Sequence, residues 1–175
     1  PEINALLMVG CLALVIALEC SSFPLYLMVP MRRERQGQRA QMESAIKYIM
    51  FGVAANGVML FGLSYLFGLT GTTSLPVMAA QLGPIVQSPL VVLGLALSFC
   101  GLYYKLAIFP FHFWTPDVYQ GASNETAGLI ATLPKIGAVA VLVRLVSLAT
   151  PQHGTIALLL SCLAVGSMLF GNLLA

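Results

Sequence analysis

Five apolar stretches, each long enough to cross a lipid bilayer, make up most of this chain. They cover residues 3–29, 44–69, 89–120, 124–148 and 155–175. A helix needs about 20 apolar residues to span the hydrocarbon core of a membrane. Only 8% of the residues are charged, whereas soluble domains average about 25%. We therefore expect an all-α membrane protein, a polytopic bundle of about five transmembrane helices.

Prolines interrupt three of these stretches. Pro24 is expected to kink the first span, because proline removes one backbone hydrogen bond from a helix. Pro110 cannot donate to the carbonyl of Leu106, so the third span is expected to be broken near residue 110. Pro134 lies near the centre of the fourth span. Backbone groups freed at such breaks must be satisfied by protein or by water at membrane depth.

The connections between the spans predict the orientation of the chain. The loop after the first span is basic, and its charged residues are Arg32, Arg33, Glu34, Arg35 and Arg39. Cytoplasmic loops are rich in Lys and Arg, so this loop is expected in the cytoplasm. A lipid-binding polybasic patch is the alternative. The uncharged connection at residues 70–88 is expected outside, with a short interfacial helix at Leu75–Leu82.

Three ionisable side chains lie inside the apolar spans, namely Glu19, Lys105 and Lys135. A charge at the centre of a membrane helix costs roughly 2.5–3.5 kcal/mol on insertion scales. Such residues usually face the interior of a bundle and often mark proton or ion routes. We therefore predict a proton path through these three residues. The alternative is that they pair only to hold the helices in register.

A proton relay is chemically reasonable for this set. A carboxylate beside a buried lysine favours its charged form, so Lys105 would hold its proton while Glu19 is near and release it more easily when the pair opens. Lys135 would then accept the proton through water. His112 follows the break, and the usual histidine pKa near 6.5 suits a shuttle toward the cytoplasmic side. The alternative for His112 is a hydrogen bond to the carbonyls freed near Pro110.

Several further residues have structural interpretations. Glu43 and Lys47 are four residues apart, which suits a pair on one helix face, and Lys47 is also placed to reach the membrane surface. Asp117 is interpreted as a turn residue, with a water-facing proton antenna as the alternative. Trp114 and Tyr119 suit anchors at the membrane interface. Small residues in the second span predict close approach of a neighbouring helix, and they are Gly52, Ala55, Gly57 and Gly62.

No motif for a prosthetic group is present in the sequence. The cysteines lie in apolar runs without CxxC spacing, which predicts buried free thiols; they are Cys11, Cys20, Cys100 and Cys162. The sequence also lacks iron–sulfur, haem, zinc, dinucleotide and phosphate-loop patterns. We expect no redox cofactor or metal in this chain and no binding to nucleic acid. Both ends fall in apolar sequence, so the chain is expected to be a fragment.

Three segments of the sequence carry a specific resemblance. They read MESAIKYIMFG, GLYYKLAIFPFHFWTPDVYQGA and TLPKIGAVAVLVRL. They resemble the antiporter-like membrane subunits of respiratory complex I, and most of all the subunit N family of bacterial NADH:quinone oxidoreductase. The resemblance covers essentially the whole chain, which looks like most of the first of two inverted repeats.

The resemblance implies a function within a large complex. Glu19, Lys105 and Lys135 match the family's proton-relay residues. The subunit would translocate protons, driven by chemistry on other subunits that hold NADH, FMN, iron–sulfur clusters and quinone. Its partners would be the other membrane-arm subunits and the lipid bilayer. It would lie in the inner (plasma) membrane of the cell.

Two other functions remain open on the sequence. One is a subunit of a cation/proton antiporter or of a membrane-bound hydrogenase; an antiporter would exchange sodium for protons without NADH. The other is a non-transporting membrane scaffold, in which neutralising Lys105 would lower assembly and leave turnover per complex unchanged. The segment FPFHFWTPDVYQGA favours the subunit N family over the antiporter and hydrogenase subunits.

Overall fold

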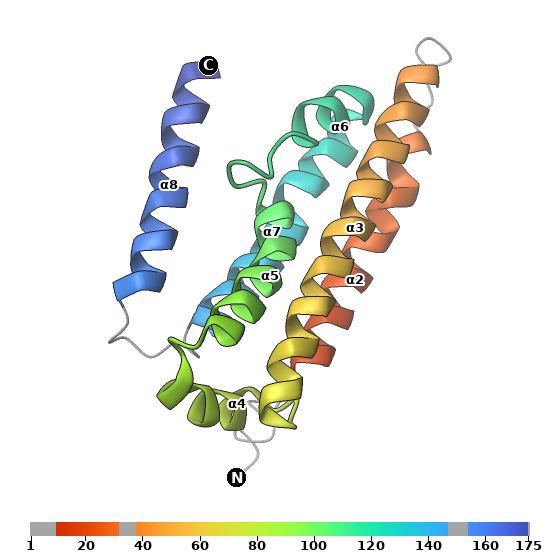
Figure 1. The fold of residues 1–175 in the computed structure, drawn as a ribbon. Helices are drawn as coiled ribbons and strands as arrows, with labels where there is room; N and C mark the ends of the chain where they lie inside the picture. Colours follow the sequence, from red (N-terminus) through yellow and green to blue (C-terminus); the bar gives the residue numbers. More distant parts are fainter. Residues whose placement is uncertain (1–9, 32–37, 147–153, 175) are drawn as a thin grey trace.

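The chain forms a helical bundle in the computed structural model, which describes residues 10–31, 38–146 and 154–174 (Figure 1). Within these ranges every regular element is a helix and no strand occurs, so the predicted all-α architecture is confirmed. The α-helices are α2 (Cys11–Met28), α3 (Gln38–Thr70), α4 (Leu75–Leu82), α5 (Pro89–Leu106), α6 (Thr115–Gly121), α7 (Asn124–Val146) and α8 (Gly154–Leu174). Short 3₁₀ turns lie at Val29–Met31 and Gly83–Ile85.

Within the described residues, four helices are long and apolar enough to cross a membrane. Their apolar stretches are Leu12–Met31, Arg39–Thr70, Pro89–Leu106 and Asn124–Val143. They coincide with four of the five expected spans, so the chain is a multi-pass membrane protein. The fifth expected span coincides with α8, whose described apolar part, Leu160–Leu173, is shorter. Residues 3–9 of the first expected span and residues 32–37 of the basic loop lie outside the described residues.

Helices α3 and α5 pack closely because small residues face each other between them. A Cβ added at Gly62 would lie 2.5 Å from Ser98 N and 2.7 Å from Gly94 O. A Cβ added at Gly101 would lie 2.7 Å from Met59 Cβ. Backbones therefore approach here as they do at other small-residue contacts between membrane helices.

The small residues of α3 do not all serve the same contact. Gly62 and Ala55 face α5, as predicted. Gly52 instead leaves room for the hydroxyl of Tyr26 on α2. A Cβ at Gly57 would meet nothing within 4 Å, so the expected helix contact is absent at that position among the described residues.

The third predicted span ends before Pro110 rather than at it. Ala107, just after α5, adopts the left-handed conformation with φ 56° and ψ 40°. Its N–H donates to Tyr104 O at 3.0 Å, and Ile108 N–H donates to Tyr103 O at 3.0 Å. These two bonds form a Schellman motif, which closes the end of a helix. Proline disfavours the helical conformation in the residue before it, so the chain leaves the helix about one turn early.

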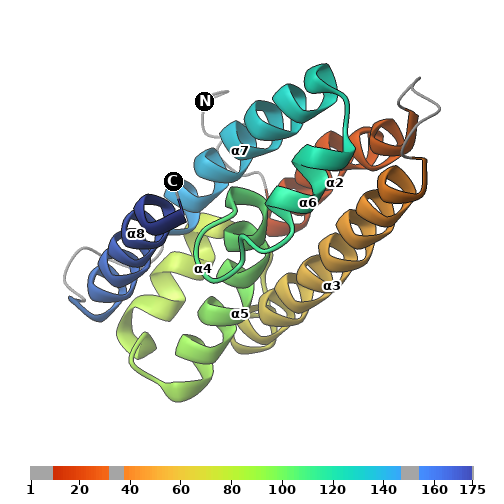
Figure 2. The same cartoon turned by 90° about the horizontal axis from the view of Figure 1, so that it is seen from above.

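An irregular connection follows and leads into α6. It covers residues 107–114 and includes a cis peptide bond between Phe109 and Pro110. The predicted helix at residues 89–120 is thus two helices, α5 and α6, separated by this connection. Helix α6 lies beside α3, while α8 stands at one edge of the bundle (Figures 1 and 2).

Helix α7 begins as the sequence predicts. Ser123 Oγ accepts a hydrogen bond from Thr126 N–H at 3.2 Å, which makes Ser123 the N-cap. In the described part of the chain, two apolar clusters hold the bundle together. The second of them surrounds the ends of α5 and α6 and is rich in aromatic side chains; these are Tyr26, Tyr48, Tyr104 and Trp114.

Candidate functional site

Lys105 and Glu19 form an ion pair inside the bundle. Lys105 Nζ lies 2.9 Å from Glu19 Oε1, although the two residues come from different helices, α5 and α2. The side chain of Lys105 is only 3% exposed, whereas that of Glu19 is 36% exposed. The ammonium is therefore withdrawn from solvent, and its partner carboxylate keeps an open side.

Ser22 is a further partner of this lysine that the sequence analysis did not assign. Lys105 Nζ donates to Ser22 Oγ at 2.8 Å, and Ser22 Oγ lies 2.9 Å from Leu18 O. Glu19 and Ser22 are three residues apart, so both side chains lie on the face of α2 that meets α5. An ammonium has three N–H donors, and these two contacts use two of them. The spacing from Glu19 is the sequence signal that would have identified Ser22.

A small cavity of about 10 Å³ adjoins Lys105. Roughly this volume holds one water molecule. The cavity is lined by Ser22, Tyr26, Tyr48, Tyr104, Lys105, Trp114, Ile130 and Pro134. Pro134 belongs to α7 and directly precedes Lys135, so the cavity lies between Lys105 and the part of α7 that carries the second lysine.

Trp114 closes one side of this cavity and satisfies the backbone at the end of α5. Its ring stacks on Tyr48 with centroids 4.9 Å apart, and its Nε1 donates to Tyr104 O at 3.0 Å. Trp114 is 2% exposed, so its ring packs inside the bundle and is not turned outward to lipid. A tryptophan beside a broken helix can supply the hydrogen bond that the missing turn would have made.

Lys135 lies apart from the ion pair. Its side chain is half-buried, and Nζ lies 6.0 Å from the centroid of the Tyr119 ring. Among the described residues, Lys135 forms no ion pair with Glu19. The structure thus brings two of the predicted relay residues into contact and leaves the third near the cavity and an aromatic ring.

His112 contacts α8 rather than the freed carbonyls at the end of α5. Its ring lies 4.5 Å from that of Phe170 and 5.7 Å from that of Phe109, measured between centroids. Its Nδ1 is buried and has no hydrogen-bond partner in the described part of the chain. The carbonyl of Tyr104 is bonded by Trp114 and Ala107 instead.

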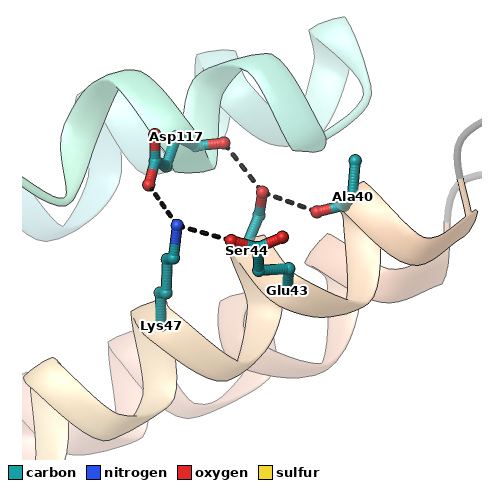
Figure 3. A network of polar contacts seen from close by, with 5 residues as sticks. All are labelled: Ala40, Glu43, Ser44, Lys47 and Asp117. Atoms are coloured by element: carbon teal, nitrogen blue, oxygen red, sulfur yellow. Dashed lines mark hydrogen bonds and ion pairs between the residues drawn. The ribbon is translucent and has the colours of Figure 1, made fainter.

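A second polar network joins the start of α3 to α6 (Figure 3). Lys47 Nζ lies 2.7 Å from Glu43 Oε1 and 2.8 Å from Asp117 Oδ2. Ser44 Oγ lies 2.8 Å from Ala40 O and 2.9 Å from Asp117 O. The predicted pair of Glu43 and Lys47 is therefore present. Asp117 is more than a turn residue, because it links two helices.

The cysteines and acidic residues do not gather into a metal site within the part of the chain that the structure describes. Cys20 and Cys162 are exposed free thiols and Cys100 is half-buried, so the prediction of buried thiols is wrong for the first two. The outer face of a membrane helix is apolar as well, so an apolar run does not mark burial. The side chain of Cys11 lies outside the described residues.

Comparisons with known proteins give a consistent match. The sequence model of a family described as NADH:quinone oxidoreductase/Mrp antiporter, transmembrane, matches residues 10–175. A protein of Opitutus terrae named NADH-quinone oxidoreductase subunit N 2 is 73% identical over 164 residues, or 94% of this chain and 34% of that protein. A protein of the same name from Solidesulfovibrio magneticus is 47% identical over 173 residues, or 97% of this chain and 36% of that protein. This chain spans about a third of the length of these relatives.

Two solved structures contain chains with a similar fold. A chain of respiratory complex I from Thermus thermophilus with bound aureothin aligns with TM-score 0.74 and 36% identity, over 93% of this chain and 33% of that one. A chain of the membrane-bound sulfane sulfur reductase, an archaeal respiratory membrane complex, aligns with TM-score 0.77 over 89% of this chain and 31% of that one. The second chain is 23% identical, so it shows a common fold alone.

Proposed function

This chain belongs to the NADH:quinone oxidoreductase/Mrp antiporter transmembrane family, and from that membership we propose that it serves in a proton-translocating membrane subunit of an NADH:quinone oxidoreductase. The names of its relatives support this choice within the family. Chemistry on other subunits would drive the transport.

The observation that carries the proposal is the ion pair of Lys105 and Glu19. An ammonium that is 3% exposed inside a membrane bundle is held by one carboxylate at 2.9 Å and one hydroxyl. Breaking a buried pair leaves an uncompensated charge, which is strongly unfavourable. A movement that separates Glu19 from Lys105 would therefore favour release of the lysine's proton.

The path from Lys105 to the next relay site is short in this proposal. The cavity beside Lys105 has room for about one water molecule and reaches Pro134. In this proposal a water there passes the proton on to Lys135, the next relay site, and His112 continues the path. The chain itself would need no prosthetic group for this transfer.

The setting of the subunit is part of the same proposal. NADH, FMN, iron–sulfur clusters and quinone would be bound by partner subunits, and the other membrane-arm subunits and lipid would surround this one. We place the subunit in the inner (plasma) membrane of the cell with the loop Arg32–Arg39 in the cytoplasm. The basic composition of that loop supports this orientation.

Replacement of Lys105 tests the proposal. Lys105→Ala and Glu19→Gln are introduced into the complete subunit within its native complex, with Leu27→Ala on the exposed face of α2 as the control. NADH-driven quinone reduction and proton uptake into vesicles are measured per assembled complex. Both should fall in the two site variants and stay at the wild-type level in the control.

The outcomes separate the alternatives. Normal activity per complex together with poor assembly would assign Lys105 a scaffolding role and overturn the proposal. Sodium–proton exchange in vesicles without NADH, lost in Lys105→Ala, would favour an antiporter, the other activity in the family's description.

A further inference from the structure

Lys105 lies at a place where a helix normally loosens. It is the last residue but one of α5, which ends at Leu106. The last carbonyls of a helix have no partner within it, and helix ends fray. Even so, the ammonium of Lys105 lies 2.9 Å from Glu19 and 2.8 Å from Ser22 on α2. Because two contacts of this length need a fixed backbone, the end of α5 requires a support of its own.

Three aromatic residues from three elements meet beside this helix end. They are Tyr48 of α3, Tyr104 of α5, and Trp114, which directly precedes α6. Each of them is almost completely buried. Each also contacts both of the others, so the three residues form a closed set, which we call the aromatic brace.

The contacts of the aromatic brace involve the backbone as well as the rings. Trp114 Nε1 donates to the carbonyl of Tyr104 at 3.0 Å. The hydroxyl of Tyr104 donates to the carbonyl of Tyr48 at 3.1 Å. The rings of Tyr48 and Trp114 stack with their centroids 4.9 Å apart. Because the Tyr104 carbonyl is part of the peptide bond to Lys105, the indole N–H holds the backbone directly beside the lysine.

The aromatic brace also lies next to the ammonium's surroundings. All three of its members line the cavity beside Lys105. Tyr104 and Lys105 are adjacent in α5 and reach different helices, since the tyrosine bonds α3 and the lysine bonds α2. A shift of the Tyr104 backbone would therefore move the ammonium relative to its partners on α2.

We propose that Trp114 and Tyr104 are positioning residues for Lys105, which fix the end of α5 against α3 and so hold the ammonium within reach of Glu19 and Ser22. Groups that act together in a functional site must be held to within about 0.5 Å. This inference rests on the proposed function. It adds two residues that act through Lys105 and carry no proton themselves.

A second aromatic contact between the same two parts of the chain provides a comparison. Phe51 of α3 and Phe113 meet edge to face, with ring centroids 4.7 Å apart. Both rings are exposed, and neither lines the cavity beside Lys105. This pair shares the packing of the aromatic brace and lacks its bond to the backbone beside the lysine.

Conservative variants separate positioning from packing. Trp114→Phe keeps a ring against Tyr48 and removes the indole N–H, and Tyr104→Phe removes only a hydroxyl. Phe113→Leu is the control for the first variant. Tyr103→Phe is the control for the second, because Tyr103 is buried in the same helix and does not line the cavity. All are made in the complete subunit within its complex, and NADH-driven proton uptake into vesicles is measured per assembled complex.

We expect proton uptake per complex to fall roughly two- to tenfold in Trp114→Phe and in Tyr104→Phe, which is the effect of losing one hydrogen bond of ordinary net strength. The controls should match the wild type. Combined with Lys105→Ala, Trp114→Phe should cause no further loss, because no ammonium is left to position. An equal further loss in that background would overturn the inference, since Trp114 would then act through another group.

The outcomes distinguish the inference from the proposed function. If Lys105→Ala lowers proton uptake but Trp114→Phe and Tyr104→Phe match their controls, the positioning role is wrong and the proposed function stands. If Lys105→Ala has no effect, the proposed function falls and the inference falls with it.

A structure of the complete complex carrying Trp114→Phe gives a second test, independent of transport. Displacement of Lys105 Nζ beyond hydrogen-bond distance from Glu19 or Ser22 supports the inference, and unchanged distances to both overturn it. Tyr104→Phe takes the place of Trp114→Phe in both tests if the tryptophan variant does not assemble.

Discussion

Lys47 and Asp117 join two helices whose contact residues are 70 positions apart in the sequence. Lys47 Nζ lies 2.8 Å from Asp117 Oδ2, and the same ammonium lies 2.7 Å from Glu43. Asp117 thus ties α6 to α3. Because α6 carries Tyr119 and follows Trp114, this contact positions side chains that face Lys135 and the cavity beside Lys105.

We predict that Asp117→Asn lowers the thermal unfolding midpoint at low ionic strength, because it removes the charge that binds α6 to α3. The three charged side chains of the network are partly exposed, so salt screens their attraction. The midpoints of variant and wild type should therefore converge as salt is added. Glu43→Gln is the matched control and should have less effect, because the bridge between the helices remains. A deficit in Asp117→Asn that is unchanged at high salt would contradict this account.

We predict that Ser22→Ala destabilises the bundle because Lys105 loses a buried partner. A hydrogen bond to a charged group contributes about 1.5–3 kcal/mol, and this one measures 2.8 Å. Ser21→Ala is the matched control on the same helix, because the Ser21 hydroxyl bonds Leu18 O. The free energy of unfolding, measured with denaturant in detergent, should fall by about 1.5 kcal/mol more in Ser22→Ala than in Ser21→Ala. Equal losses would mean that Ser22 does not stabilise the ammonium.

Local sequence patterns were sufficient to single out the ionisable residues of the candidate site. Glu19, Lys105 and Lys135 stand out because each interrupts an apolar span, where an isolated charge is costly. The bounds of α4 were also predictable, because a proline marks the first turn of a short apolar segment without charge. These features depend only on neighbouring residues and on the bilayer as solvent.

The remaining features depend on contacts that sequence order does not reveal. The bond between Ser22 and Lys105 and the bridge between Lys47 and Asp117 each join residues far apart in the chain. The burial of Trp114 follows from the early end of α5, which exposes a carbonyl for its indole N–H. That early end depends in turn on one alanine adopting a left-handed conformation, which residue preferences disfavour.

We predict opposite effects of alanine at two glycines of α3. A Cβ at position 62 would lie within 2.5–2.8 Å of the α5 backbone, whereas a Cβ at position 57 would meet nothing within 4 Å. Gly62→Ala should cost roughly 1–3 kcal/mol, as overpacking usually does. Gly57→Ala should be neutral or stabilising by up to about 1 kcal/mol, because alanine favours helix more than glycine does. Denaturant unfolding of both variants checks the pair, and similar stability changes would show that α3 and α5 do not pack as described.

We predict that Ala107→Gly stabilises the end of α5. The left-handed conformation at φ 56° costs an alanine roughly 1–2 kcal/mol, and glycine avoids most of that cost. Part of the gain is offset because glycine also has more freedom in the unfolded chain, so the net increase in unfolding free energy should be at most about 1 kcal/mol. Ala140→Gly, at an exposed position inside α7, is the control and should destabilise by about 1 kcal/mol. Opposite signs for the two variants would confirm the Schellman end before Pro110, and equal losses would mean that α5 continues through Ala107.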